Sequence, residues 1–126
     1  MIKIYCIGKL KKEYKVIADD YLKRMKDVFV LEFKDEEKLH EKLKKEICRV
    51  YICDEKGKEL NSNEFAKLLK EDCCFVIGSA EGFKKYPKGE KISFSKMTFT
   101  HQLFRLMLIE QIYRGKCILN GHPFPK

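Results

Sequence analysis

Long apolar runs are missing from this sequence, since none approaches the roughly 18 residues that a membrane-spanning helix requires. Its first residues, MIKIYCIGKLKKEY, also lack the long apolar stretch and the small-residue cleavage site of a secretory signal peptide. No repeat or linker interrupts the 126 residues, a length typical of one domain. We therefore expect residues 1–126 to form a single cytoplasmic domain without a membrane partner.

Metal-binding cysteine patterns are also missing. No C-x-x-C pair occurs, and no histidine stands at ligand spacing from the adjacent Cys73 and Cys74, so we expect no metal site. All six cysteines lie in apolar, strand-like or helix-like segments: Cys6, Cys48, Cys53, Cys73, Cys74 and Cys117. We interpret them as small buried hydrophobic residues and not as a disulfide framework.

Arginine is scarce, although the chain is basic. Lysine and arginine together number 27 against 19 acidic residues, which gives a net charge of +8, but only Arg24, Arg49, Arg105 and Arg114 are arginines. Such a charge would attract a polyanion such as RNA or DNA. Because nearly all of it is lysine, solvated surfaces explain the charge equally well, and composition alone leaves both interpretations open.

Apolar residues are plentiful, at 44% of the chain with 9 Phe and 6 Tyr, so a disordered chain is excluded. Short apolar runs alternate with amphipathic stretches. Strands are predicted at 2–7, 28–33, 49–54, 73–77 and 92–94, and helices at 14–25, 35–48, 61–69 and 100–115. This order predicts an α/β domain with a largely parallel sheet, helices on both faces and a ligand crevice beyond the carboxyl ends of the strands.

Two of these helices have specific signals. Leu39, Leu43 and Ile47 recur on one face of the highly charged segment 35–48. Asn61 followed by Glu64 resembles a capping box and predicts a helix start. The segment 81–91, which contains glycine and proline, is predicted to be a loop.

The last predicted helix is apolar around nearly its whole circumference. The residues responsible are Leu103, Phe104, Leu106, Met107, Leu108, Ile109, Ile112 and Tyr113. Such a helix must be buried on all sides, and a domain this small has little chain left to cover its outer face. We therefore predict a homodimer through this helix. The alternative is that the segment 81–91 and the C-terminal tail cover it.

Charged and titratable residues lie on and after this helix. His101 with Arg105, and Glu110 with Arg114, are spaced to share a helix face, and the second pair is typical of an ordinary salt bridge. In the closing segment NGHPFPK, His122 is a candidate for proton transfer, although a frayed terminus has the same appearance.

The stretch FVIGSAEGF places Gly78 and Gly82 at a turn directly after a predicted strand, where the backbone can approach a ligand. It lacks the G-x-G-x-x-G pattern of dinucleotide sites and the lysine of a phosphate-binding loop. Neither an NAD site nor an ATPase site is therefore supported, and a plain strand-to-loop turn would look the same.

Several segments together resemble one known family. FVIGSAEGF, ISFSKMTFTHQLFRLMLIEQIYRG and NGHPFPK, with IKIYCIGKLKKEY and RVYICDEKGKEL, are similar to the RlmH (YbeA-type) ribosomal RNA methyltransferases of the SPOUT superfamily over almost the whole chain. The resemblance implies an α/β domain with a C-terminal trefoil knot that binds S-adenosylmethionine. It also implies a homodimer that methylates N3 of a pseudouridine in helix 69 of 23S rRNA on the assembled ribosome.

By position, the resemblance implies that three strand-end loops hold the cofactor. The residues concerned are Cys53, Gly78, Ser95, Lys96, Met97, Thr98, Phe99 and Thr100. The family usually has a bulky aliphatic residue in place of Cys53 and proline in place of Thr100.

Catalytic roles are assigned on the same basis. His122 would act as base or orient the uracil edge, with Tyr113 and Arg114 as further catalytic candidates. Arg105 and Lys126 would contact the substrate RNA.

The tail departs from the family pattern, which usually reads HPYHK or HPYHR. Phe124 and Pro125 replace its tyrosine and second histidine. The main alternative is therefore a catalytically silent relative that binds cofactor or RNA without turnover. A flavodoxin-like nucleotide module and an RNA-binding protein without cofactor are weaker alternatives.

Overall fold

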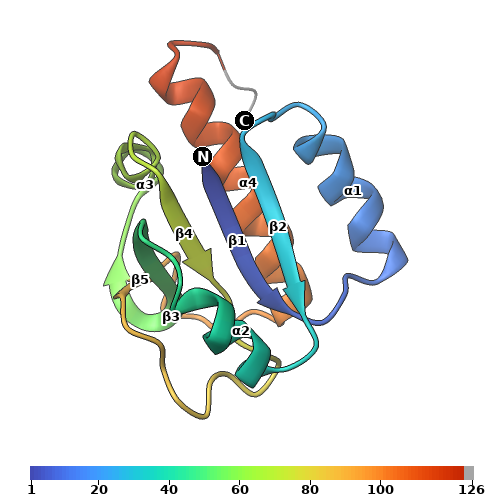
Figure 1. The fold of residues 1–126 in the computed structure, drawn as a ribbon. Helices are drawn as coiled ribbons and strands as arrows, with labels where there is room; N and C mark the ends of the chain where they lie inside the picture. Colours follow the sequence, from blue (N-terminus) through green and yellow to red (C-terminus); the bar gives the residue numbers. More distant parts are fainter. Residues whose placement is uncertain (124–126) are drawn as a thin grey trace.

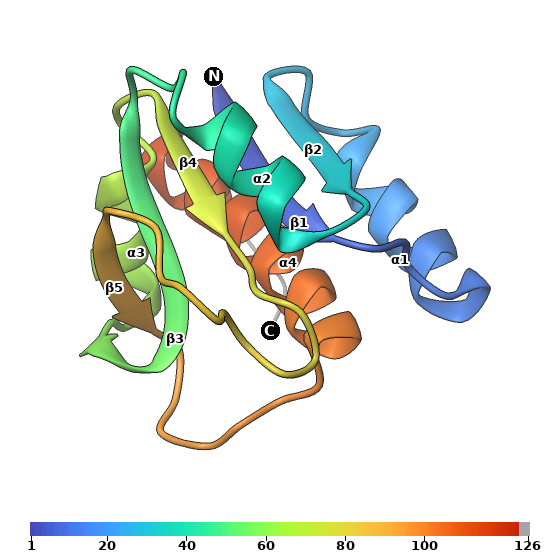
Figure 2. The same cartoon turned by 60° about the horizontal axis from the view of Figure 1, so that its bottom comes forward.

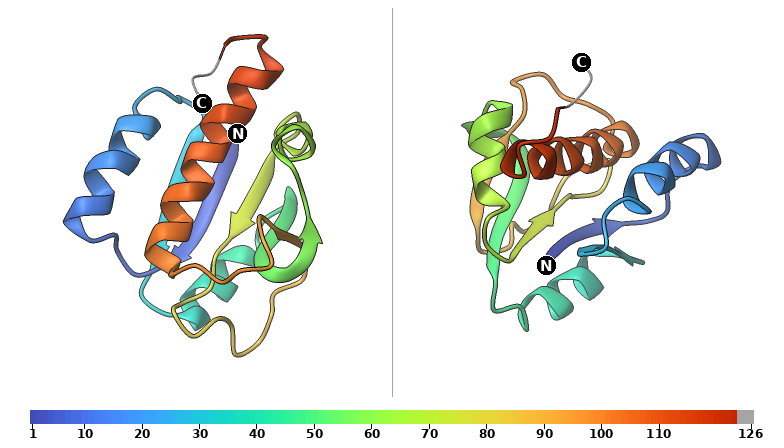
Figure 3. Two further views of the ribbon diagram at one scale, coloured as in Figure 1. Left: turned by 180° about the vertical axis from the view of Figure 1, so that it is seen from behind. Right: turned by 90° about the horizontal axis from the view of Figure 1, so that it is seen from above.

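The computed structural model describes residues 1–123 and has three layers, helices–sheet–helix (Figure 1, Figure 3). Along the chain the elements are β1 (Ile2–Ile7), α1 (Lys12–Leu22), β2 (Val28–Phe33), α2 (Glu36–Leu43), β3 (Arg49–Glu59), α3 (Ser62–Leu68), β4 (Cys73–Val76), β5 (Glu90–Ser93) and α4 (His101–Leu119). The predicted alternation of strands and helices is confirmed. No helix of the described residues is long and apolar enough to cross a membrane.

The strands within residues 1–123 form one five-stranded sheet in the order β2-β1-β4-β3-β5, and all neighbouring pairs are parallel. Ile4 of β1 lies opposite Val30 on one side and Phe75 on the other. Because every strand runs in the same direction, the carboxyl ends of β4, β3 and β5 meet side by side at one edge of the sheet. The predicted parallel α/β architecture is therefore confirmed.

Helices cover both faces of the sheet, as Figure 3 shows. The larger apolar cluster lies on the face that carries α1, α3 and α4, and Leu108, Ile109 and Ile112 of α4 are fully buried in it. A smaller cluster on the other face packs Leu39 of α2 against Tyr5 and its neighbours. Helix α4 packs between α1 and α3 and is the central helix of its layer.

Local sequence signals explain where several elements begin. Asn61 caps α3, because its Oδ1 accepts from the Glu64 amide (2.8 Å) and Glu64 Oε1 accepts from the Asn61 amide (2.9 Å). This is the predicted capping box. Thr100 caps α4 by accepting from the Leu103 amide at 3.3 Å.

Strand β3 is longer than predicted and continues through the charged segment DEKGKE to Glu59. Its pairing with β5 is interrupted by a bulge between Cys53 and Lys58. Gly57 lies in this bulge against the β5 backbone, where an added Cβ would be 2.6 Å from the Ile92 nitrogen. The strand was missed beyond residue 54 because pairing with a distant edge strand, and not an apolar pattern, holds it in place.

The ends of α1, α2 and α4 differ from the prediction by two residues or more, and α1 spans Lys12–Leu22 where 14–25 was expected. Helix α2 ends at Leu43, and Ile47, which was expected on its apolar face, is fully exposed. Helix α4 continues to Leu119 through Gly115, where the sequence predicted its end. A Cβ at Gly115 would be 2.6 Å from Leu69 Cδ1, so this glycine serves close packing between α4 and α3 and not helix termination.

Apolar side chains remain exposed beside α4. Leu103 is 38% exposed on α4, and Val16 and Ile17 on the adjacent α1 are more exposed still. The inner face of α4 is buried as expected. Its outer flank is not fully covered by residues 1–123. The homodimer prediction requires such an uncovered apolar flank, and the homodimer itself stays a prediction.

Candidate functional site

A cavity of about 300 Å³ lies beyond the carboxyl ends of β4 and β5 and beside the bulged middle of β3. Figure 2 shows the loops that follow β4 and β5 at this edge of the sheet. His101 and Phe104, in the first turn of α4, form part of the cavity lining. The residues that line it are Cys53, Asp54, Glu55, residues 77–83, Tyr86, residues 93–95, residues 97–99, His101 and Phe104. This is the crevice that the parallel topology predicted.

The wall after β4 is a tight glycine turn. The Gly82 amide donates to the Ser79 carbonyl (2.8 Å), the Ser79 hydroxyl donates to the Gly82 carbonyl (3.0 Å), and Gly82 has φ of +80°. A Cβ at Gly78 would lie 3.1–3.2 Å from Gly82 backbone atoms and the Phe83 ring. Glycine at 78 therefore allows the chain to fold back closely upon the end of β4.

The wall after β5 is shaped by serine side chains. The buried Ser93 hydroxyl donates to the Ser95 carbonyl (2.6 Å) and accepts from the Ser95 amide (3.1 Å). The Ser95 hydroxyl in turn accepts from the Met97 amide at 3.0 Å. These bonds satisfy the loop backbone locally and hold it open along the cavity.

Most of the predicted cofactor residues come together here. Six of the eight line the cavity: Cys53, Gly78, Ser95, Met97, Thr98 and Phe99. Lys96 is exposed and Thr100 is the N-cap of α4, and neither is among the lining residues. The sequence prediction therefore selected residues of one cavity from three separate segments.

Asp54 and Tyr86 line the cavity but were not predicted. Burial acts to raise the pKa of Asp54, yet hydrogen bonds from the Tyr86 side chain and the Lys56 amide hold it below the ordinary value. The same Asp54 bond raises the pKa of Tyr86, whose ring also carries Lys91 Nζ 3.8 Å from its centroid. Asp54 lies within β3, directly after its apolar first half, and in the sequence it stands where an apolar strand-like run gives way to charged residues. Ligand contacts gather at such positions in parallel α/β folds, so this signal was available in the sequence.

Glu36, at the start of α2, anchors the loop that forms one cavity wall. Its carboxylate accepts from the amides of Lys84 (2.8 Å) and Lys85 (3.1 Å), and His40 Nε2 lies 3.3 Å away. The Lys84 amide bond is the main cause of a lowered Glu36 pKa. The His40 and Phe83 rings also contact one another, with centroids 6.2 Å apart. No local pattern in the sequence indicates this long-range contact.

Arg105 differs from its prediction. Its side chain is 2% exposed, with Nη1 2.6 Å from Glu32 Oε2 and Nη2 donating to the carbonyls of Gly8 (2.9 Å) and Ile7 (3.4 Å). The guanidinium is therefore committed inside the fold and is not available to an RNA phosphate. It joins α4 to the ends of β1 and β2 and is not paired with His101, which lines the cavity instead.

The predicted catalytic residues of α4 lie away from the cavity. Arg114 forms the predicted salt bridge with Glu110, at 3.1 Å. The Tyr113 ring packs against Tyr21, with centroids 5.6 Å apart, and Arg24 lies over it. Neither Tyr113 nor Arg114 is among the residues that line the cavity.

His122 follows the far end of α4. A helix rises about 1.5 Å per residue, so α4 extends roughly 27 Å from His101 at the cavity to Leu119, and His122 follows this far end. Its side chain is exposed, and its amide donates to the Cys117 carbonyl at 2.9 Å. Lys126, predicted to contact RNA, lies outside the described residues, as do Phe124 and Pro125. One subunit alone therefore does not bring His122 to the cavity.

Comparison with known proteins agrees with this arrangement. Residues 1–124 match the family model described as a predicted SPOUT methyltransferase. Proteins named ribosomal RNA large subunit methyltransferase H are 41% identical in Mycoplasmopsis pulmonis, with 99% of both chains covered, and 38% identical in Caldicellulosiruptor saccharolyticus, with both covered completely. These alignments span 144 and 154 positions, so this chain of 126 residues lacks segments that the relatives have. The parallel fold, the strand-end cavity and these full-length matches place the chain in the SPOUT methyltransferase family, with the ribosomal RNA large subunit methyltransferases H.

Proposed function

We propose that this protein transfers a methyl group from S-adenosylmethionine to N3 of a pseudouridine in helix 69 of 23S rRNA, on the assembled ribosome in the cytoplasm. The observation that carries this proposal is the match, over 99–100% of each chain, to relatives whose names specify methylation of large-subunit ribosomal RNA. The cavity at the strand ends supports it by offering a site for the cofactor.

The residues around the cavity suit this cofactor. Its volume is at the lower end of the range of about 300–1,000 Å³ for small-molecule sites. Phe94 and Phe99 supply apolar surface for a purine, and the backbone of the middle of β3 and of the loops after β4 and β5 is expected to form hydrogen bonds with the cofactor. The carboxyl groups of Asp54, Glu55 and Glu81 favour a ligand that carries a sulfonium and an ammonium group.

The chemistry assigned to the chain is positioning and proton removal. When bound, the cofactor supplies the methyl group as a substituent of its sulfonium sulfur. The strand-end loops are expected to hold the donor so that the accepting nitrogen is in line with the breaking bond. His122 is expected to remove the N3 proton or to orient the uracil edge, and Tyr113 and Arg114 are further candidates for this role.

A homodimer would bring the cavity and His122 together, although they lie far apart within one chain. His122 follows the end of α4, a helix roughly 27 Å long whose other end lies at the cavity of the same chain. A two-fold pairing that runs one α4 against another would bring the tail of each subunit to its partner's cavity. The exposed apolar residues Val16, Ile17 and Leu103, beside or on α4, support an interface there.

Two further features of the family are part of the proposal. We expect the chain after β4 to form the trefoil knot implied by the resemblance, with the cofactor held in the knotted loops. We also expect RNA contacts from the lysines of the cavity rim in place of Arg105, because Lys84, Lys85 and Lys88 are exposed and the net charge is +8.

The test is transfer of labelled methyl from S-adenosylmethionine to assembled ribosomes that lack the modification, with free ribosomal RNA in parallel and identification of the product nucleoside. Methylated pseudouridine formed on ribosomes alone is the expected result. A folded dimer that binds the cofactor but transfers no methyl group would instead be the catalytically silent relative, and the HPFPK tail is the feature that favours this second candidate.

A further inference from the structure

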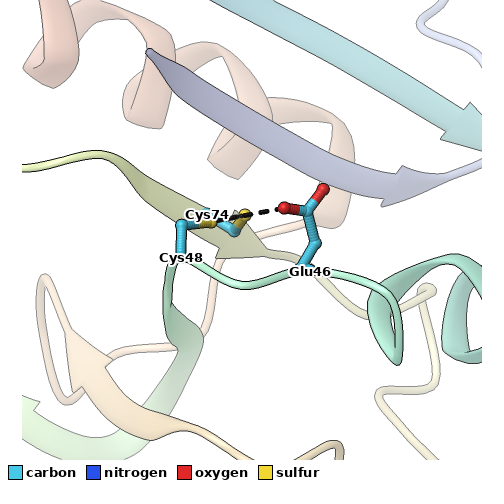
Figure 4. A group of neighbouring side chains, drawn as sticks. All are labelled: Glu46, Cys48 and Cys74. Atoms are coloured by element: carbon cyan, nitrogen blue, oxygen red, sulfur yellow. Dashed lines mark hydrogen bonds between the residues drawn. The ribbon is translucent and has the colours of Figure 1, made fainter.

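A cluster of Glu46, Cys48 and Cys74 lies on the α2 face of the sheet (Figure 4). Cys48 directly precedes β3, and Cys74 is the second residue of β4. Val50 is the register partner of Cys74. Cys48 packs in the same apolar cluster as Cys74 and Val50, so the three side chains lie on one face of the sheet. The cluster is therefore at the amino-terminal ends of these strands, the edge opposite the cavity.

The two sulfur atoms are in unusually close contact. Cys48 Sγ lies 2.6 Å from Cys74 Sγ, although both residues are free thiols in this structure. Non-bonded carbon atoms pack at about 3.5–4.0 Å, and sulfur is larger than carbon. A disulfide requires about 2.05 Å, so bond formation needs only a small approach of the two side chains.

Two thiols and a carboxylate also suggest a zinc site, but the surroundings of this cluster disfavour one. Zinc–sulfur bonds of about 2.3 Å in tetrahedral geometry would hold the two thiolates about 3.8 Å apart. In addition, Lys3 Nζ lies 2.8 Å from Glu46 Oε1, the oxygen that also accepts from the Tyr5 hydroxyl. This carboxylate already neutralises a cation, and the ammonium group would repel a second one.

We propose that Cys48 and Cys74 form a redox modification site, at which a low-molecular-weight disulfide such as oxidised glutathione converts the two thiols into an intramolecular disulfide. The Cys48 thiolate attacks one sulfur of the oxidant, which forms a mixed disulfide and releases one thiolate. The Cys74 thiolate then attacks the Cys48 sulfur and releases the second. Two cysteine thiols are oxidised, one disulfide is reduced to two thiols, and these take up the two protons.

The order of the two steps follows from exposure. Cys48 is half-buried and can meet an oxidant, whereas Cys74 is completely buried and can react only with Cys48. Burial also raises the pKa of both thiols. The reaction is therefore expected to accelerate with rising pH, because the thiolate is the attacking species.

The test uses the reduced full-length protein in glutathione buffers of increasing oxidised fraction, at about pH 8, where more thiolate is present. Remaining thiols are alkylated and counted by intact mass, and non-reduced peptides are mapped. Cys48→Ser removes the attacking sulfur, and Cys117→Ser, also half-buried, is the matched control. Cys74→Ala provides a second variant should Cys48→Ser fail to fold by circular dichroism.

The wild type and Cys117→Ser are expected to lose two thiols and to yield one cross-linked peptide pair containing Cys48 and Cys74. Their melting temperature should rise on oxidation, and that of Cys48→Ser should not. A lasting glutathione adduct on Cys48, a different pairing or six free thiols would overturn the proposal. So would equimolar zinc protecting both thiols in a Cys48-dependent way, because the cluster would then be a metal site. None of these results depends on methyl transfer.

Discussion

At the scale of single residues, glycine and arginine have the clearest structural roles. Gly78 is needed because the chain folds back onto the end of β4, and Arg105 is buried because one guanidinium can satisfy a carboxylate and two carbonyls at once. Both residues were singled out from the sequence. Gly78 lines the cavity, and its role in cofactor binding stays a prediction, whereas the Arg105 side chain is bound inside the fold.

Gly78→Val is predicted to weaken S-adenosylmethionine binding at least about tenfold, or about 1.4 kcal/mol. The added side chain would overlap Gly82 and Phe83 and fill part of the cavity, and the overpacking would reduce stability by about 1–3 kcal/mol. Calorimetric titration with the cofactor measures the affinity, and circular dichroism checks the fold. Unchanged affinity in a folded protein would show that the cofactor binds elsewhere.

Arg105→Met is predicted to lower the free energy of unfolding by about 2–4 kcal/mol, because Glu32 and the two carbonyls lose their partner inside the fold. Lys15→Met, which breaks an exposed ion pair with Asp19, should change stability little and is the control. Urea denaturation measures both. Equal effects of the two substitutions would mean that the Arg105 contacts contribute no more than a surface pair.

At the scale of elements, the connections between strands and helices decide the shape of the site. The loop after β4 is tied to the start of α2 by Glu36, and the loop after β5 is held by its own serines. The loop after β4 is therefore held by an element far away in the sequence, whereas the loop after β5 is held by hydrogen bonds among its own residues. The loop after β4 should therefore be the one that responds to changes outside the cavity.

Glu36→Ala is predicted to release this loop and to weaken cofactor binding about three- to tenfold, because the cavity wall must then be ordered on binding. Glu37→Ala, in the same first turn of α2, is the matched control. Hydrogen exchange of the Lys84 and Lys85 amides should accelerate in Glu36→Ala only. Unaltered exchange at both amides would show that the carboxylate does not hold the loop.

Glu46 links the start of β3 to Lys3 and Tyr5 of β1 and should make stability depend on pH. Burial opposes its ionisation, but hydrogen bonds from Lys3, Tyr5 and Cys48 lower its pKa to about 2. Because an unfolded glutamate titrates near 4.3, the stabilisation is complete above that pH and is lost as the pH falls towards about 2. The contribution is on the order of 2–3 kcal/mol.

The measurement is denaturant unfolding of the wild type and Glu46→Gln between about pH 7 and pH 2.5, the window set by these pKa values. The difference in stability between the two proteins should shrink steadily below about pH 4.5. A difference that is constant with pH would mean that the carboxylate charge makes no net contribution.

At the scale of the whole molecule, the proposed dimer predicts complementation between two inactive variants. Gly78→Val disables the cavity when the assay uses a cofactor concentration far below the dissociation constant of this variant, and His122→Ala disables the tail. In a mixed dimer, one of the two composite sites retains an intact cavity and an intact tail. Coexpression in equal amounts should therefore restore about a quarter of wild-type methyl transfer, since half of the dimers are mixed and half of their sites are complete.

Each variant alone should remain inactive in the same assay. No recovery in verified mixed dimers would indicate that cavity and tail of one subunit work together. This outcome would require a path for the tail different from the one that α4 gives residues up to 123.

The sequence by itself determined the features that depend on local chemistry. Apolar runs bounded by turn residues placed β1 and β2 at their observed bounds, and the Asn61–Glu64 pair placed the start of α3. Six residues of the cavity were named because the motifs resembled a known family, whose cofactor contacts were carried over by position. Such signals are carried by residues a few positions apart, so they can be recognised without the fold.

Tertiary structure decided the contacts between residues far apart in the chain. Arg105 binds Glu32 across 73 positions, Glu36 holds the loop at Lys84 across 48, and Cys48 meets Cys74 across 26. Gly115 looked like a helix end because glycine has a low helix propensity, but close packing of α4 on α3 outweighs this propensity. The distance between the cavity and His122 was likewise set by the length and placement of α4. Side-chain partners depend on how the layers pack, and no short-range pattern encodes that packing.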